Sequence, residues 1–340
     1  MLGDIVDSNR INIGEIHLGH SPNCFVESLR ATLNHRLPGG RYFVDRHLSF
    51  LYWNDNPGDF KKFYVSSFLI DDLLDAVNEL DEISFAARRT DNIYQAEEEL
   101  VKSLKNGIPV MVFVDTFFLE FFPKKQGHEV HLLVASKLNQ KNVFVSSSLP
   151  YSGWVPLEKI SVARHSRINE RWIRNTWFEI LYPAHDEELS LKHVPLFLRA
   201  NINQMKKGEA TKCGRIYGIH GIEMFRNDLA IWLDNAEQKI LQKILQELFS
   251  QLLFLVDQRK RFVGFLGYIS NKVNFNLSSD IEIYTKIAKE WEIFRNLCFK
   301  ASKGLLMDTS RLAKRLALLI DLEKEGLMEI EKSLNQLGNV

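Results

Sequence analysis

The chain has 340 residues, and its 45% apolar and 25% charged content is ordinary for a globular protein. Its 43 Lys and Arg balance 43 Asp and Glu, which argues against a general nucleic-acid binder, because such proteins need a basic surface. The cysteines, Cys24, Cys213 and Cys298, are too scattered for a disulfide scaffold or a structural zinc site. Since the sequence shows no signal peptide and no long apolar run, we expect a cytoplasmic protein that binds neither membrane nor nucleic acid.

The first half of the chain mixes helical and strand-like segments. "GIPVMVFVD" (107–115) is a β-rich run that follows a helix, whose end is marked by Lys105 and Gly107. "KLNQK" is a hairpin loop between two further strands. The patterns predict helices over 22–36, 69–79 and 92–106, and strands over 107–115, 128–136, 142–148 and 176–183.

The second half has a different texture, with little strand-like alternation. Apolar residues recur at helical spacing over 221–273, 279–303 and 309–336, which indicates an amphipathic helical bundle. The polar segment "AHDEELSLKH" marks the boundary between the two textures. We therefore expect two domains, an α+β domain over 1–183 and a helical domain over 190–340.

The segment "GHSPNCFVES" (19–28) places a cysteine at the start of a helix. Ser21 is a favourable N-cap and Pro22 a favourable first helical residue, which makes Cys24 the third. The positive end of a helix lowers the pKa of a thiol, and backbone N–H groups there stabilise an oxyanion, with Asn23 as a further group for this role. The pattern favours Cys24 as a nucleophile. The alternative is a buried structural cysteine, since cysteine is among the most buried residue types.

A cysteine nucleophile needs a base, usually a histidine held by a carboxylate or an amide. His128 and His131 stand out because "GHEVHLLVASKL" puts them at the start of an apolar strand. They are three positions apart, so on a regular strand they point to opposite faces and only one of them faces Cys24. A solvent-facing histidine at a strand end is the alternative. Because "HEVH" falls short of the helical HExxH zinc pattern, we expect no metal.

Three segments, in this order, resemble the N-terminal domain of the butirosin biosynthesis protein H family. They are "NCFVESLRATLNH", "GIPVMVFVDTFFLEFF" and "HEVHLLVASKLNQKNVFVSSSLPYSGWVPLEKI", and the resemblance is clearest over about 17–165. That family is similar to papain-like cysteine peptidases and pairs this domain with a helical C-terminal region. The resemblance implies an α+β fold: a papain-like domain, in which the helix carrying the cysteine packs on an antiparallel sheet, followed by an all-α domain.

The resemblance also implies a cysteine acyltransferase of natural-product biosynthesis, of the peptide or aminoglycoside type. Such an enzyme takes an acyl or aminoacyl group from the phosphopantetheine thioester of an acyl or peptidyl carrier protein and passes it to a small-molecule amine acceptor. Such an enzyme binds no cofactor of its own, and its assembly as a homodimer stays open. Carried over by position, the nucleophile is Cys24, the base is His131 with His128 as the alternative, and Asp115 is the strand-end aspartate.

One position departs from the papain-like pattern, in which an aspartate or asparagine after the next strand orients the imidazole. Here that place reads "VFVSSSLP", and the hydroxyl of Ser147 stabilises an imidazolium less than a carboxylate does. Three explanations are open. Ser147 or Asp115 orients the histidine, the pair of Cys24 and the histidine works without a third residue, or the catalytic activity is reduced. Two other functions therefore stay open: a papain-like peptidase or amidase with the same Cys24 and His131, and a catalytically reduced binding protein of the same fold.

Overall fold

The structure is a computed structural model that describes residues 23–36, 39–54, 63–67, 84–122, 127–148, 151–166, 174–181, 194–208, 214–273, 275–306 and 308–337. The predicted helix over 69–79, the predicted cap at Ser21 and Pro22, and Cys213 lie outside these residues. The chain divides into two compact units: Met1–Val44 with Leu74–Leu189, and Asp45–Leu73 with Ser190–Val340.

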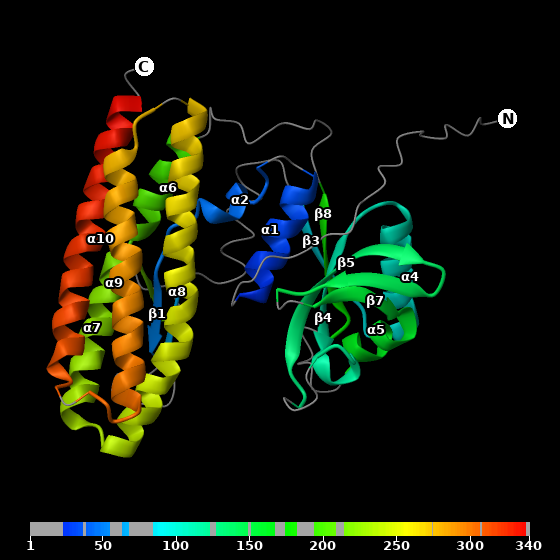
Figure 1. Cartoon of the computed structure of the whole chain (residues 1–340), viewed down its shortest axis with the longest axis horizontal. Coiled ribbons are helices and arrows are strands. Elements are labelled where there is room, and N and C mark those ends of the chain that lie inside the picture. Colours follow the sequence, from blue (N-terminus) through cyan, green and yellow to red (C-terminus); the bar gives the residue numbers. More distant parts are fainter. Residues whose placement is uncertain are drawn as a thin grey trace. The chain divides into compact units, whose positions relative to one another are not determined.

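The first unit is built on a six-stranded antiparallel sheet with the strand order β3-β8-β4-β5-β6-β7 (Figure 1). Helix α1 (Cys24–Arg36) packs against β5, and α4 and α5 pack against β5 and β4. The expected arrangement, an α+β unit with the helix of Cys24 packed on an antiparallel sheet, is confirmed. Its other elements are β3 (Ser84–Arg89), α4 (Ile93–Lys105), β4 (Val110–Asp115), η1 (Thr116–Phe118), β5 (Val130–Asn139), β6 (Asn142–Ser146), β7 (Ser152–Pro156), α5 (Leu157–Arg164) and β8 (Thr176–Leu181).

The sheet buries both of its faces, as alternate residues of β4 show. Val114 belongs to a buried cluster that includes Leu104 of α4. Its neighbour Phe113 meets Phe178 of β8 edge-to-face, with ring centroids 5.9 Å apart, and Phe178 meets Phe25 of α1 at 5.6 Å. Because successive strand residues point to opposite faces, α1 covers one face of the sheet while α4 and α5 cover the other.

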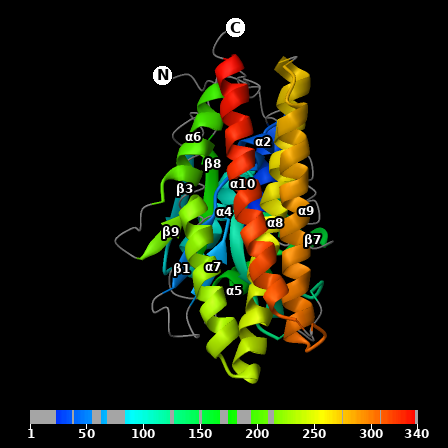
Figure 2. The same cartoon turned by 90° about the vertical axis from the view of Figure 1, so that its left-hand side faces the viewer.

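Within its described residues, the second unit has five long helices and a small antiparallel sheet with the order β2-β1-β9 (Figure 2). The helices over 218–273, 278–302 and 310–337 agree with the predicted bundle segments. The elements are β1 (Leu51–Asn54), β2 (Phe63–Ser66), α6 (Val194–Lys206), β9 (Arg215–Tyr217), α7 (Gly218–Asn235), α8 (Gln238–Val273), α9 (Ser278–Ser302) and α10 (Ser310–Leu337); the short α2 (Tyr42–Asp45) lies where the units change.

The segment 45–73 differs from the predicted division at 183 and 190, because it groups with the helices. Its strand β1 pairs with β2 on one side and with β9 on the other, and the Tyr52 hydroxyl donates to Asp228 of α7 over 2.5 Å. The second unit is therefore not all-α. Pairing between segments more than 150 residues apart leaves no local sequence pattern, which is why the sequence did not place it.

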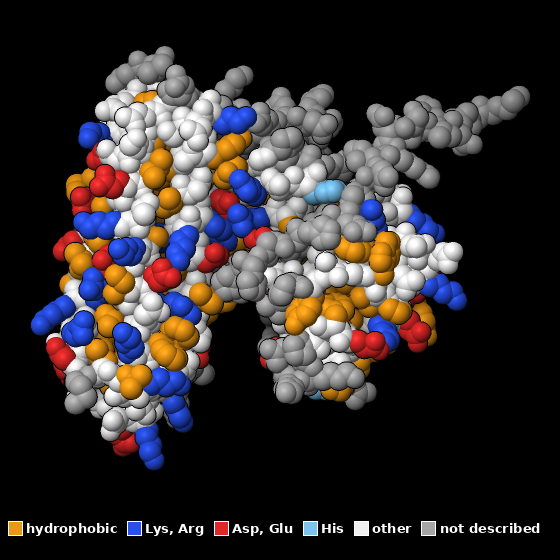
Figure 3. Space-filling view, viewed as in Figure 1, with side chains coloured by type: hydrophobic (Ala, Val, Ile, Leu, Met, Phe, Trp, Pro, Cys, Tyr) orange, Lys and Arg blue, Asp and Glu red, His pale blue; other side chains and the backbone are white. Residues whose placement is uncertain are grey.

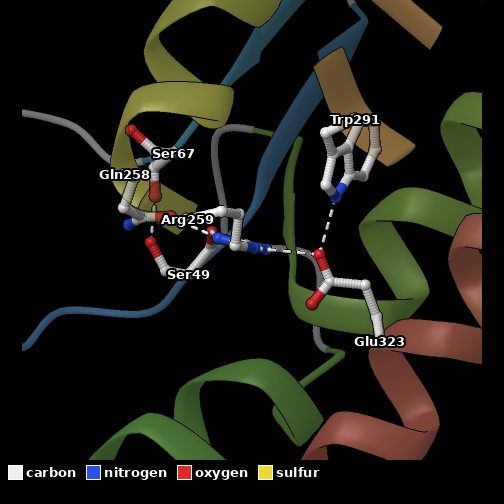
Figure 4. Close-up of polar contacts among 6 residues, drawn as sticks. All are labelled: Ser49, Ser67, Gln258, Arg259, Trp291 and Glu323. Atoms are coloured by element: carbon white, nitrogen blue, oxygen red, sulfur yellow. Dashed lines mark hydrogen bonds and ion pairs between the residues drawn. The ribbon is translucent and has the colours of Figure 1, made fainter. Parts of the chain in front are cut away.

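A buried ion pair lies among the helices of this second unit (Figure 4). Arg259 Nε of α8 lies 2.9 Å from Glu323 Oε1 of α10, and both side chains are fully buried. The Trp291 indole N–H of α9 donates to the same carboxylate oxygen over 2.7 Å. Arg259 Nη1 also donates to the Ser49 carbonyl over 2.8 Å, so the cluster joins three helices to the segment before β1.

Charges of both signs are interspersed over the helical unit on the face shown in Figure 3, where no broad field of one sign forms. This distribution fits the balanced charge of the sequence. None of the helices within the described ranges has both the length and the apolar character that a bilayer span requires.

Candidate active site

Asn23 begins the helix that carries the candidate nucleophile. Its side-chain Oδ1 accepts the Val26 N–H over 3.1 Å, and its carbonyl accepts the Glu27 N–H over 3.0 Å. Asn23 is therefore the N-cap and Cys24 the first helical residue, two positions earlier in the helix than the sequence predicted. The prediction was wrong because an asparagine oxygen caps as well as a serine hydroxyl does, and Asn23 stands nearer to the apolar stripe.

The sulfur of Cys24 lies beside the strand of the candidate base. The backbone N–H groups of Leu132, Phe25 and Cys24 itself hydrogen-bond to the sulfur. Since Leu132 directly follows His131, the sulfur lies next to the peptide bond that joins these two residues. The helix start and β5 thus bring the Cys24 sulfur beside the β5 backbone at Leu132, although the two segments are far apart in the sequence.

Burial raises the pKa of the Cys24 thiol above its ordinary value, and the N–H groups around the sulfur offset this only in part. The sequence predicted the opposite direction from the helix terminus alone. Loss of solvation of the thiolate outweighs the helix terminus here, so the resting residue is a thiol at neutral pH.

His131 stands at the start of β5 and is held by a serine. Its Nε2 lies 2.8 Å from Ser147 Oγ, and its ring meets the Phe122 ring edge-on with centroids 5.4 Å apart. Burial lowers the pKa of His131 to about 4, so the imidazole is neutral at pH 7. With Nε2 bonded to the serine hydroxyl, Nδ1 is the ring nitrogen left for a thiol.

Ser147 occupies the position that the sequence suggested for an orienting group. It follows directly on β6, is 2% exposed, and its N–H donates to the Tyr151 carbonyl over 2.9 Å in the turn before β7. A hydroxyl fixed in this way holds the imidazole in one orientation, but it brings no negative charge to stabilise an imidazolium.

Asp115, which the sequence suggested as an orienting group, contacts His128, the alternative base. Val114 pairs with His131 across the β4–β5 ladder, so the next residue, Asp115, points to the opposite face of the sheet. Its fully buried carboxylate accepts from Ser166 Oγ over 2.6 Å and lies 2.8 Å from His128 Nδ1. Sequence reasoning missed Ser166, which lies 51 positions away and carries no pattern of its own.

His128 is the more exposed of the two histidines, with 46% of its side chain accessible. Its ring stacks on that of Phe117 with centroids 4.1 Å apart. The structure therefore contains two separate histidine pairs at this end of the sheet, His131 with Ser147 and His128 with Asp115. The Leu132 N–H, which follows His131 in the chain, hydrogen-bonds to the sulfur of Cys24.

The surroundings of Cys24 contain several of the groups that nucleophilic cysteine catalysis uses. A thiol lies at a helix N-terminus, where backbone N–H groups converge, and a neutral, oriented imidazole lies on the adjacent strand. Donors in such a place stabilise the oxyanion of an acyl-transfer intermediate. Asn23 contributes the helix cap, and its Oδ1 is engaged with Val26.

The chain is similar to a known protein family and to solved structures. Residues 33–148, about a third of the chain, match the family described as Butirosin biosynthesis protein H, N-terminal. The crystal structure of a putative C39-like peptidase from Bacillus anthracis is 17% identical, covers 51% of this chain and 96% of its own, and has a TM-score of 0.33. No curated protein matches the sequence.

The family match includes both histidines, Asp115 and Ser147, and it begins after Cys24. It is narrower than the segment over which the sequence suggested the resemblance, but it names the same family. Over residues 33–148 the chain therefore matches the N-terminal domain of the butirosin biosynthesis protein H family, as the sequence predicted.

Proposed function

We propose that this protein is a cysteine acyltransferase, which moves an acyl group from a carrier-protein thioester to an amine through an acyl-Cys24 intermediate. The observation that carries the proposal is the hydrogen bond from the Leu132 N–H to the Cys24 sulfur, because it sets the thiol against the strand of His131. The imidazole of His131 is itself oriented by Ser147. The family match over 33–148 supports an enzyme of natural-product biosynthesis.

The first half-reaction forms the acyl-enzyme. His131 takes the proton of Cys24 as the sulfur attacks the thioester carbonyl, and a new C–S bond forms. The N–H groups at the start of α1 stabilise the oxyanion of the tetrahedral intermediate. The bond to the carrier thiol then breaks, and the carrier sulfur receives the proton from His131.

The second half-reaction transfers the acyl group. The nitrogen of a neutral amine attacks the acyl-Cys24 carbonyl, a C–N bond forms, and the bond to Cys24 breaks. The amine proton passes through His131 to the Cys24 sulfur, which restores the resting thiol and neutral imidazole. One base serves both halves because the leaving thiol and the entering amine occupy the same side of the acyl carbon.

The state of the resting pair decides how the nucleophile is generated. The pKa of the Cys24 thiol is raised and that of His131 is lowered to about 4, so a standing thiolate–imidazolium pair is disfavoured. The thiolate therefore forms during attack, by general-base catalysis. A neutral imidazole is the protonation state that this step needs at pH 7.

The test uses an acyl group loaded on a carrier protein, with and without a primary amine. We expect amide product with the amine present, and we expect Cys24→Ala to abolish it. His131→Ala lowers the rate by at least about a hundredfold, which is the range of general acid–base catalysis. His128→Ala is the matched control, because His128 pairs with Asp115 and not with Ser147.

Three outcomes would change the assignment. Free acid released at a rate that the amine does not alter would assign a hydrolase with the same nucleophile. A larger loss with His128→Ala than with His131→Ala would make His128 the base. Complete inertness of the wild-type chain toward thioesters would favour the binding protein.

A further inference from the structure

A cavity of about 550 Å³ lies at the edge of the first unit's sheet, among β3, β8 and α4. Cys24, His131, Asp115 and Ser147 are not among the residues that line it. Its volume falls within the range of about 300–1,000 Å³ that is usual for small-molecule sites. The lining residues are Arg88, Arg89, Thr90, Gln95, Glu99, Lys102, Ser103, Asn106, Ile108, Trp177 and Glu179.

The floor of this cavity holds a buried carboxylate that orients an arginine. Glu179 is 8% exposed and accepts from Arg88 Nε over 2.7 Å, from Ser103 Oγ over 2.9 Å and from the Trp177 indole N–H over 3.1 Å. These donors hold the pKa of Glu179 below its ordinary value, although burial acts in the opposite direction. The carboxylate is therefore charged, and its negative charge is already balanced by Arg88.

Arg88 keeps the rest of its guanidinium available. It pairs with Glu179 through Nε, and 53% of its side chain is accessible. Among the described residues, its two Nη groups have no hydrogen-bond partner. These are the groups that form the bidentate fork with carboxylates and phosphates.

Two further cations line the same cavity, and both are loosely paired. Arg89 lies 3.6 Å from Asp91, and Lys102 lies 3.6 Å from Glu99. Exposed pairs at such separations contribute little and are readily exchanged for a better partner. Arg88 and Arg89 are neighbours on β3, which pairs only with β8 among the described strands, so both reach the cavity around a sheet edge.

We propose that this cavity binds the phosphate or carboxylate group of a small molecule, with Arg88, Arg89 and Lys102 as its ligands. Glu179 acts as the positioning residue that aims Arg88, and the buried Ser103 and Trp177 fix Glu179 in turn. The occupant is a small molecule because the site is a cavity of limited volume and not an extended charged surface. The site is separate from Cys24, so the proposal does not rest on acyl transfer.

The test is calorimetric titration of the full chain with pyrophosphate and, separately, with succinate. Arg88→Gln keeps a side-chain donor for Glu179 but loses the two Nη groups that form the bidentate contact. The double variant Arg89→Gln/Lys102→Gln removes two exposed cations and leaves the hydrogen bonds of Glu179 in place. We expect each variant to weaken binding by at least about tenfold. Lys105→Gln is the matched control, because this exposed lysine lies on the same helix, α4, outside the cavity.

Each outcome is decisive for the site. Tighter binding of pyrophosphate assigns a phosphate ligand, and tighter binding of succinate assigns a carboxylate ligand. Cys24→Ala should bind as the wild type does, which separates this result from that of the acyl-transfer assay. No binding of either anion, or equal weakening by Lys105→Gln, would overturn the proposal.

Discussion

The environment of the Cys24 sulfur is decided by two opposing effects, solvation and hydrogen bonding. Three backbone N–H groups stabilise the thiolate, yet the pKa of the thiol is still raised, because burial removes more solvation than these groups replace. The neighbouring imidazole is also held neutral by burial, with a pKa of about 4. In the proposed mechanism, the proton therefore passes from Cys24 to His131 during the reaction and not before it.

This charge state predicts the pH dependence of Cys24 alkylation. At pH 7 the thiolate fraction is small, because the pH lies below the raised pKa of the thiol. We expect iodoacetamide to label Cys24 more slowly than free glutathione at pH 7, with a rate that keeps rising above pH 9. The measurement is peptide mass mapping of a Cys213→Ser background, in which Cys298 is buried and protected. A plateau of the rate below pH 7 would show a standing thiolate and contradict this assignment.

The hydroxyl of Ser147 should matter for rate more than for stability. Ser147→Ala leaves His131 Nε2 without its 2.8 Å partner, so the imidazole loses its fixed orientation. A single hydrogen bond contributes about 1 kcal/mol, so acylation of Cys24 should slow by about fivefold to tenfold. Ser148→Ala is the control, since this serine is equally buried but does not bond His131. Equal rates for the two variants would mean that Ser147 does not orient the base.

Sequence reasoning found the element ends that carry the candidate site. Cys24 stands at a helix start, His131 near the start of a strand and Ser147 directly after the next strand, and His131 Nε2 lies 2.8 Å from Ser147 Oγ. It could not place Asp115, which served there as a candidate orienting group for His131. The face of the strand on which Asp115 lies depends on the register between β4 and β5, and that register is not a local property.

Among the secondary-structure elements, those with capping or turn residues were predicted most closely. The helix expected over 92–106 is observed over Ile93–Lys105, with Asn92 Oδ1 accepting the Tyr94 N–H and with Gly107 at a φ of 73° just past its end. The hairpin loop expected at "KLNQK" is shorter, because β5 runs to Asn139 and β6 begins at Asn142. Lys137, Leu138 and Asn139 therefore belong to β5, although the polar composition of this segment indicated a loop.

Strands β1, β2, β3, β7 and β9 were not predicted. Each has only three to six residues and is stabilised by a partner strand that the sequence does not reveal, whereas the equally short β4, β6 and β8 lie in apolar runs that predicted them. Tertiary pairing, and not local propensity, decides their structure.

The start of α1 depends on one capping residue. Asn23→Ala removes the acceptor of the Val26 N–H and should lower the free energy of unfolding by about 1 kcal/mol. Urea denaturation followed by circular dichroism measures this loss. Asn34→Ala, an exposed position inside the same helix, is the control and should be neutral or slightly stabilising. If Asn23→Ala were as stable as Asn34→Ala, the helix would not begin at this cap.

At the scale of the whole molecule, each unit has its own source of stability. The first unit relies on apolar residues packed on both faces of its sheet. The second buries an arginine and a glutamate among its helices, and Arg259 Nη2 and Glu323 Oε2 are buried without hydrogen-bond partners among the described residues. Burying such a pair costs solvation free energy. Each charge therefore depends on its partner, because removing one would leave the other buried and unpaired.

This dependence predicts a non-additive response to substitution. Arg259→Met leaves Glu323 as an unpaired buried charge and should destabilise the second unit by about 3–5 kcal/mol. The double variant Arg259→Met/Glu323→Leu removes both charges and should be more stable than the single variant. Lys260→Met is the control, because its pair with Glu292 is half exposed. Urea denaturation of the wild type, the single variants Arg259→Met and Glu323→Leu, and the double variant, compared as a double-mutant cycle, tests this. A double variant less stable than the single one would contradict the role assigned to the pair.

The central claim is that Cys24 becomes covalently acylated with the help of His131. Peptide mapping by mass spectrometry, after brief exposure of the full chain to an acyl-loaded carrier protein, measures this most directly. The account predicts one added acyl mass on the peptide that contains Cys24, greatly reduced in His131→Ala and retained in His128→Ala. An unmodified Cys24 under conditions in which the thioester is consumed, or the same acylation without His131, would contradict it.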